Sequence, residues 1–235
     1  MSEDIPFTWY RVSCPKSVRQ TPFRIVGFQL DPKDAHHDVV QKAIRAAARQ
    51  GGIPLAPDGS VRNPDQLFKT RYLGALSEIL LVRFLQRQLG EEFRVARDDH
   101  FRGYENHTDI TVRWNDRVVT LEVRGSFPYR PLQRVLCELF DVIGPYATTY
   151  KPGEPSRDFY LRTLINEKVD DFSPNRPHRL YFVGGAEAAL FGDEGGRTDL
   201  KQAGAEYLTI KPIAKARDAA EILGLIRQSL KGEKR

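Results

Sequence analysis

The chain has 235 residues, of which 40% are hydrophobic and 29% are charged, and its formal net charge is +5. This composition excludes disordered and fibrous proteins and is typical of a globular protein with one well-buried core. The basic balance, with a pI of about 9.2, favours polyanionic partners. No lysine occurs between residues 70 and 150. The strongly basic side chains of this region are therefore all arginines, whose planar guanidinium binds phosphate in a bidentate manner. A GC-rich genome would produce the same bias.

The number of cysteines and the length of the apolar stretches indicate in which cellular compartment the protein is expected. Cys14 and Cys137 are the only cysteines, and they predict neither a disulfide framework nor a zinc site. The first ten residues lack the basic start and the apolar run of a signal peptide. No apolar stretch approaches the length of a membrane span. We therefore expect a cytoplasmic protein with reduced thiols and no membrane partner.

The first 64 residues predict one strand and one helix. Residues 23–30 are typical of a strand, and residues 36–50 place an apolar face at helical spacing before a Gly-Gly stop. Residues 53–64, rich in Pro, Gly and Asp, are typical of a loop. We interpret residues 1–64 as an N-terminal extension packed on the main core.

The segment between Pro64 and Gly90 is the clearest helix in the sequence. Its apolar residues form a stripe along one face of the helix, and further apolar residues beside it make the stripe wider. This width predicts burial on two sides of the helix. The stripe consists of Phe68, Tyr72, Leu76, Ile79 and Leu80, widened by Leu81, Val82 and Leu85. Three strands are predicted after this helix, at 93–97, 108–114 and 117–124.

The rest of the chain adds a second helix and further strands. Pro131 opens a predicted helix that ends near Gly144. The remaining predicted elements are a loop over 145–156, a helix over 158–169, strands over 179–184 and 205–211, and a C-terminal helix over 214–230. Residues 65–235 thus begin with a helix, three strands, a helix and a strand. This order predicts an α/β core with a mixed central sheet flanked by helices.

The second and third of the three strands predict a β-hairpin. Both alternate polar and apolar residues, and Asn115-Asp116 between them suits the left-handed backbone of a two-residue turn. With that turn, the register places Asp109 directly opposite Glu122, with their Cβ atoms roughly 5 Å apart.

Two opposed carboxylates destabilise a sheet unless something neutralises them. Arg124, Arg113 or a proton shared between the two carboxylates would neutralise them. A divalent cation is the economical solution, because Mg²⁺ is often held by one or two carboxylates together with water and phosphate.

Glu78 is a third candidate carboxylate. It lies inside the apolar stripe of the helix, where an unpartnered charge is costly. A cation would neutralise it, and an ion pair with Arg71 or Arg83 is the alternative.

At these residues the sequence resembles the PD-(D/E)xK nuclease superfamily, which includes restriction endonucleases. The matching residues are Glu78 in GALSEILL, Asp109 in HTDITV, and Glu122 with Arg124 in TLEVRGS. The resemblance covers residues 65–211 and implies a restriction-endonuclease-like αβββαβ core. The chain departs from the motif at Arg124, where the usual residue is lysine. Arginine stays protonated, so it cannot take a proton from water.

The resemblance implies a Mg²⁺-dependent nuclease, with Mn²⁺ as a substitute ion. Asp109 and Glu122 would ligate the ion, and Glu78 would be a further ligand or would position the attacking water. Arg124 would hold the water or stabilise charge on the phosphate. The expected substrate is DNA, with RNA as the alternative, and the expected enzyme is an endonuclease of restriction, defence or repair type. A homodimer is expected from the resemblance only.

Four arginines near the hairpin and the following helix are candidate contacts to the phosphate backbone: Arg113, Arg117, Arg130 and Arg134. Solvated surface charge is the alternative for each.

Two other functions stay open. One is a catalytically degenerate nucleic-acid-binding or scaffold protein on the same fold, which Arg124 favours. The other is a metal-free enzyme in which Asp109 and Glu122 act as an acid/base pair on glycosides.

Three other patterns carry weaker predictions. Residues 34–38 (DAHHD) look like a ligand cluster, but Asp34 suits a helix N-cap and adjacent residues rarely converge on one ion. The loop over 97–107 contains two histidines and is interpreted as either an element over the site or an ordinary polar loop. The stretch 192–196 (GDEGG) lacks the context of a P-loop.

Overall fold

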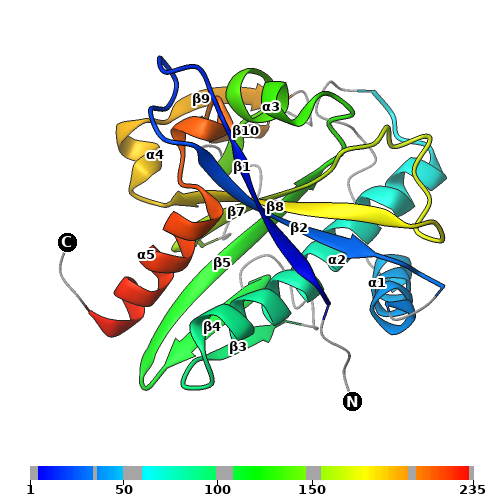
Figure 1. Ribbon diagram of the computed structural model, residues 1–235, viewed down its shortest axis with the longest axis horizontal. Coiled ribbons are helices and arrows are strands. Elements are labelled where there is room, and N and C mark those ends of the chain that lie inside the picture. Colours follow the sequence, from blue (N-terminus) through cyan, green and yellow to red (C-terminus); the bar gives the residue numbers. More distant parts are fainter. Residues whose placement is uncertain are drawn as a thin grey trace.

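The computed structural model describes residues 5–33, 36–49, 60–98, 108–146, 155–200 and 205–232. Its main sheet has seven strands in the order β1-β2-β8-β7-β5-β4-β3 (Figure 1). The strands are β1 (Phe7–Val12), β2 (Phe23–Leu30), β3 (Arg94–Arg97), β4 (Ile110–Trp114), β5 (Arg117–Ser126), β7 (Phe159–Ile165) and β8 (His178–Glu187). A smaller sheet joins β6 (Val142–Tyr146), β10 (Ala205–Ile210) and β9 (Gly196–Leu200). The fold is therefore mixed α/β.

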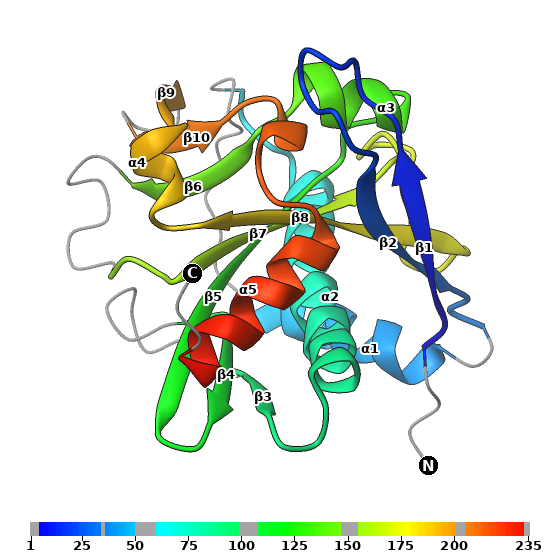
Figure 2. The same cartoon turned by 60° about the vertical axis from the view of Figure 1, so that its left-hand side comes forward.

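Each face of the main sheet packs against a different layer. The helical face, as we call it, is covered by α1 (His37–Arg49), α2 (Pro64–Leu89) and α5 (Ala219–Lys231). The opposite face is partly covered by the small sheet and by four short helices, and Figure 2 shows β6 and β10 apart from the three long helices. The short helices are α3 (Leu132–Arg134), the π-helix η1 (Val135–Leu139), α4 (Leu190–Asp193) and the 3₁₀ helix η2 (Ile213–Lys215).

The predictions for the first half of the chain are confirmed at the level of elements. The strand at 23–30 is β2, and the helix at 36–50 is α1. Helix α2 begins with a capping box, in which the Gln66 amide donates to Asn63 Oδ1 at 2.8 Å. The predicted N-terminal extension supplies β1 and β2, and β2 pairs with β8 inside the main sheet.

The predicted β-hairpin also forms in the expected register. Asn115 adopts a left-handed backbone with φ of 52° at the turn between β4 and β5. Trp114 pairs with Arg117, and the ladder continues to Ile110 opposite Leu121. Asp109 directly precedes the first residue of β4.

The predicted helix over 158–169 is wrong, because Phe159–Ile165 form strand β7. All seven residues of β7 are buried, and the strand lies between β5 and β8, parallel to β5. Because β7 is buried on both faces, its apolar residues lie on both sides of Arg162 and Thr163 without the alternation of a half-buried strand, so the pattern does not distinguish the strand from a buried helix.

The predicted helix over 131–144 is wrong in its second half. The helical turns of α3 and η1 end at Leu139, and Val142–Tyr146 form β6, which pairs with β10. The Ile213 amide donates to the Phe140 carbonyl at 2.9 Å, so contacts with a distant segment end the helix.

The expectation of two free thiols is also wrong. Cys14 and Cys137 form a disulfide between residues 123 positions apart, which joins the β1–β2 connection to η1. Their proximity depends on how β1 and η1 pack, so the cysteine count could not predict it. None of the helices in the described ranges combines the length and the apolar composition that crossing a bilayer requires.

A buried histidine predicts acid sensitivity of the fold. His178 is 3% exposed, Tyr72 Oη lies 3.1 Å from its Nε2, and the Arg176 carbonyl lies 2.7 Å from its Nδ1. Burial lowers the pKa of His178 below its ordinary value of 6.5. Below pH 6.5 the unfolded chain therefore binds a proton that the folded chain does not, and the free energy of unfolding decreases as the pH falls toward the folded pKa.

We expect this decrease to be smaller in His178→Gln than in the wild type, by at most about 1.4 kcal/mol per pH unit, the limit for one proton. Urea denaturation at pH 7.5, 6.5 and 5.5 measures the difference. An identical pH slope in both proteins would contradict a depressed histidine pKa.

Candidate active site at the end of the β4–β5 hairpin

Asp109 is anchored to the neighbouring strand. It is 7% exposed, and its Oδ2 accepts a hydrogen bond of 2.7 Å from the Val123 amide of β5. Val123 directly follows Glu122, so the carboxylate of Asp109 is held against β5 beside Glu122. The structure thus brings together the start of β4 and the middle of β5, which carry the two predicted metal ligands.

Glu122 and Arg124 project from the face opposite α2. Leu121 and Val123 pack into the core on the helical face, so the alternate residues of β5 point the other way. Glu122 Oε1 lies 3.5 Å from Arg124 Nη2, and both side chains are 15% exposed. The residue in the position of the motif lysine therefore contacts a predicted metal ligand directly.

A pair of tyrosine rings holds the Arg124 guanidinium. Tyr146 of β6 and Tyr207 of β10 are directly paired, and their ring centroids are 4.2 Å apart. The guanidinium carbon of Arg124 lies 5.2 Å from the Tyr146 centroid and 4.9 Å from the Tyr207 centroid. Such contacts attract the cation to the ring faces, so the small sheet restricts the position of Arg124.

Arg162 is a site residue that the sequence did not predict. It pairs with Arg124 in the parallel β5–β7 register and is 2% exposed. Its Nη2 donates to Ser126 Oγ at 2.8 Å and its Nη1 to the Arg124 carbonyl at 3.4 Å. The pKa of Arg162 is lowered to about 10, mainly by burial, with the charge of Asp141 opposing the decrease and that of Arg124 adding to it. Arg162 therefore stays protonated at neutral pH and fixes the end of β5.

Glu78 reaches the sheet from the helical face. Its Oε2 accepts from Arg97 Nε of β3 at 2.5 Å, and the two side chains are 9% and 12% exposed. Arg97 pairs with Ile110, whose side chain is buried on the helical face. Glu78 and Glu122 thus approach the end of β4 from opposite faces of the sheet, with Asp109 at the strand end.

The carboxylates fit a metal only in part. Among the residues that the structure describes, no three His, Cys, Asp or Glu side chains gather closely enough to hold a metal ion. Asp109 and Glu122 are two carboxylates on adjacent strands. Two carboxylates are enough for a Mg²⁺ site in which water and phosphate supply the other ligands. To become a third ligand beside Asp109 and Glu122, Glu78 would have to give up its ion pair with Arg97.

Of the four predicted phosphate contacts, only Arg113 shares the face of Glu122 by strand alternation. Arg117 donates to the Leu230 carbonyl at the end of α5 at 3.2 Å. The exposed Arg130 lies over the Tyr129 ring at 4.5 Å, and Arg134 forms an ion pair with Glu138 at 3.3 Å.

The weaker candidates add no second site. His36 Nδ1 accepts from the Asp31 amide at 3.0 Å, and His37 Nδ1 lies 3.0 Å from the Pro32 carbonyl, so both rings make local backbone contacts. Asp34, His100, Tyr104 and His107 lie outside the described residues. The stretch 192–196 spans the end of α4 and the start of β9.

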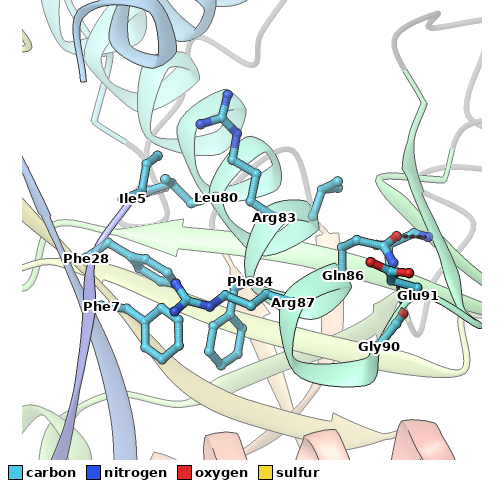
Figure 3. A pocket seen from close by; sticks show the side chains of 12 residues that line it. Ile5, Phe7, Phe28, Leu80, Arg83, Phe84, Gln86, Arg87, Gly90 and Glu91 are labelled. Atoms are coloured by element: carbon cyan, nitrogen blue, oxygen red, sulfur yellow. Dashed lines mark hydrogen bonds between the residues drawn. The ribbon is translucent and has the colours of Figure 1, made fainter. Parts of the chain in front are cut away.

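An apolar cavity of about 510 Å³ lies between β1 and the second half of α2 (Figure 3). The rings of Phe7, Phe28 and Phe84 form its floor, and the Arg87 guanidinium lies over the Phe7 ring at 5.1 Å. None of the residues predicted to act on nucleic acid lines this cavity.

Comparisons with known proteins give one distant relative. The chain is 26% identical over 248 residues to "Uncharacterized protein MJECS01" of Methanocaldococcus jannaschii. The match covers 88% of this chain and 87% of that protein, so the similarity extends over nearly the whole length of both. No family model and no solved structure matches the chain.

Proposed function

We propose that the protein is a Mg²⁺-dependent nuclease that hydrolyses phosphodiester bonds of DNA. The observation that carries the proposal is the hydrogen bond that holds the Asp109 carboxylate on β5 beside Glu122. The order of elements supports it, because α2 is followed by three antiparallel strands, the short helices α3 and η1, strand β6 of the small sheet, and then β7 parallel to β5. This order agrees with the αβββαβ core that the motif implies.

In this proposal Asp109 and Glu122 hold the ion. When bound, Mg²⁺ neutralises charge on the phosphate and lowers the pKa of a water ligand. The Val123 amide keeps the Asp109 carboxylate in place. Arg124, held by the tyrosine pair, presents a fixed positive charge to the phosphate as negative charge develops on it. Arg162 supports Arg124 through its carbonyl.

Arg124 also favours a second candidate function, which is nucleic-acid binding without cleavage. The guanidinium contacts Glu122 and cannot act as a base, because it does not lose its proton near neutral pH. Binding would still use the charges of Arg124 and of the neighbouring surface.

A cleavage assay tests both candidates. Supercoiled plasmid and single-stranded DNA are incubated with the protein in Mg²⁺, in Mn²⁺ or in EDTA, and binding is measured in parallel with Ca²⁺. We expect nicked and linear products with Mg²⁺ or Mn²⁺ and none with EDTA. DNA that is bound but never cut would select the second candidate. Cleavage that survives EDTA would contradict the metal dependence, and the absence of both binding and cleavage would contradict both functions.

A further inference from the structure

Two arginines oppose one another on the outer strands of the sheet. Arg94 of β3 and Arg113 of β4 are direct partners in the antiparallel ladder, and both are exposed. Directly opposed residues have Cβ atoms roughly 5 Å apart, and like charges in this position destabilise a sheet. Within the described ranges neither guanidinium has a carboxylate within ion-pair distance. The fold therefore keeps a repulsive pair at a solvent-facing position.

This pair lies on the same face of the sheet as Glu122. Val95, Val112 and Ile110 are packed on the helical face, so Arg94 and Arg113 project from the other face. The small sheet packs over β2, β7 and β8 on that face, and it leaves β3 and β4 at the open edge of the main sheet (Figure 2).

The surface between the arginines and the carboxylates is polar. Thr111 and Thr120 form the intervening cross-strand pair. Asp158 is one acidic neighbour of this surface, and its Oδ2 is occupied by the amide and the hydroxyl of Thr120, both at 2.7 Å. Arg113 lies four positions along the chain from Asp109, which corresponds to about 13 Å along the strand.

We propose that Arg94 and Arg113 bind the phosphate backbone of DNA beside the phosphate held at Asp109 and Glu122. A polyanion would relieve the repulsion between the two guanidinium groups, and each planar group matches a phosphate. The assignment rests on the proposed function for its choice of DNA, and it adds Arg94, which the sequence did not indicate.

The test is the salt dependence of DNA binding. Anisotropy of a labelled 20-base-pair duplex is measured in Ca²⁺ between 50 and 300 mM KCl for the wild type, Arg94→Gln, Arg113→Gln and the double variant. A substitution that removes one arginine–phosphate interaction reduces the slope of log affinity against log salt by about one. We expect the double variant to reduce the slope by about two and to bind at least about 10-fold more weakly at 100 mM KCl.

Arg45→Gln on α1 is the matched control, because it removes one exposed arginine from the other side of the molecule. It should leave the slope unchanged. A second measurement needs no DNA: replacing either Arg94 or Arg113 should keep or raise the unfolding midpoint, because it removes a like-charge repulsion.

The outcomes separate this inference from the proposed hydrolysis. If the wild type binds DNA without cutting it and the double variant shows the reduced slope, the surface assignment stands and the nuclease proposal fails. An unchanged slope in the double variant overturns the surface assignment whether or not the protein cleaves DNA. The absence of DNA binding by the wild type overturns it as well.

Discussion

Replacing Glu122 by glutamine is expected to lower the rate of Mg²⁺-dependent DNA cleavage by a factor on the order of 1,000. The substitution keeps the shape of the side chain and removes one of the two charges that would hold the ion. It also breaks the ion pair with Arg124 Nη2 at 3.5 Å. Single-turnover cleavage at saturating protein measures the rate of the chemical step without the contribution of DNA binding.

Glu138→Gln is the matched control for this experiment. Glu138 is exposed and pairs with Arg134 on the preceding turn of helix, away from β5. Its replacement removes the same charge and should leave cleavage unchanged. If Glu122→Gln cuts within about threefold of the wild-type rate while remaining folded, Glu122 does not hold the ion and the proposed site is wrong.

The second large effect is on stability, and it concerns the buried ion pair between Glu78 and Arg97. Replacing Arg97 by methionine removes the cation that pairs with the Glu78 carboxylate of α2, whose side chain is 9% exposed. We expect a loss of about 3–5 kcal/mol in the free energy of unfolding. For a chain of this size that loss lowers the thermal midpoint by about 6–20 °C.

A double-mutant cycle isolates the pair. Glu78→Leu combined with Arg97→Met should recover most of the stability, because an apolar pair replaces two buried charges. Arg134→Met, which breaks the exposed pair with Glu138, is the control and should cost less than about 1 kcal/mol. A coupling energy near zero between Glu78 and Arg97 would contradict the structural role of the ion pair.

The same variants decide what Glu78 does in the nuclease proposal. If Glu78 leaves Arg97 to join the ion, Glu78→Gln should reduce cleavage strongly at a temperature where the variant is folded. If it only anchors Arg97 and β3, cleavage per folded molecule should stay close to the wild-type rate.

Local sequence signals accounted for the parts of the fold whose causes lie within a few residues of one another. The ends of α2 follow from Asn63, Pro64 and Gly90, since capping satisfies the free backbone groups of the first and last turns. The β4–β5 register follows from the left-handed turn at Asn115, because a two-residue loop leaves one register available. The juxtaposition of the Asp109 and Glu122 positions follows from that register.

Contacts between distant segments settled the rest. Phe159–Ile165 is a strand because β5 and β8 pair with it on both sides, and Arg162 thereby comes to lie beside Arg124. The tyrosine pair and the disulfide of Cys14 join elements far apart in the chain, and the Arg97 partner of Glu78 lies on the next element, β3, which folds back along α2. Such contacts leave no periodic trace in the sequence, because each of them depends on the packing of whole layers and not on the spacing of neighbouring residues.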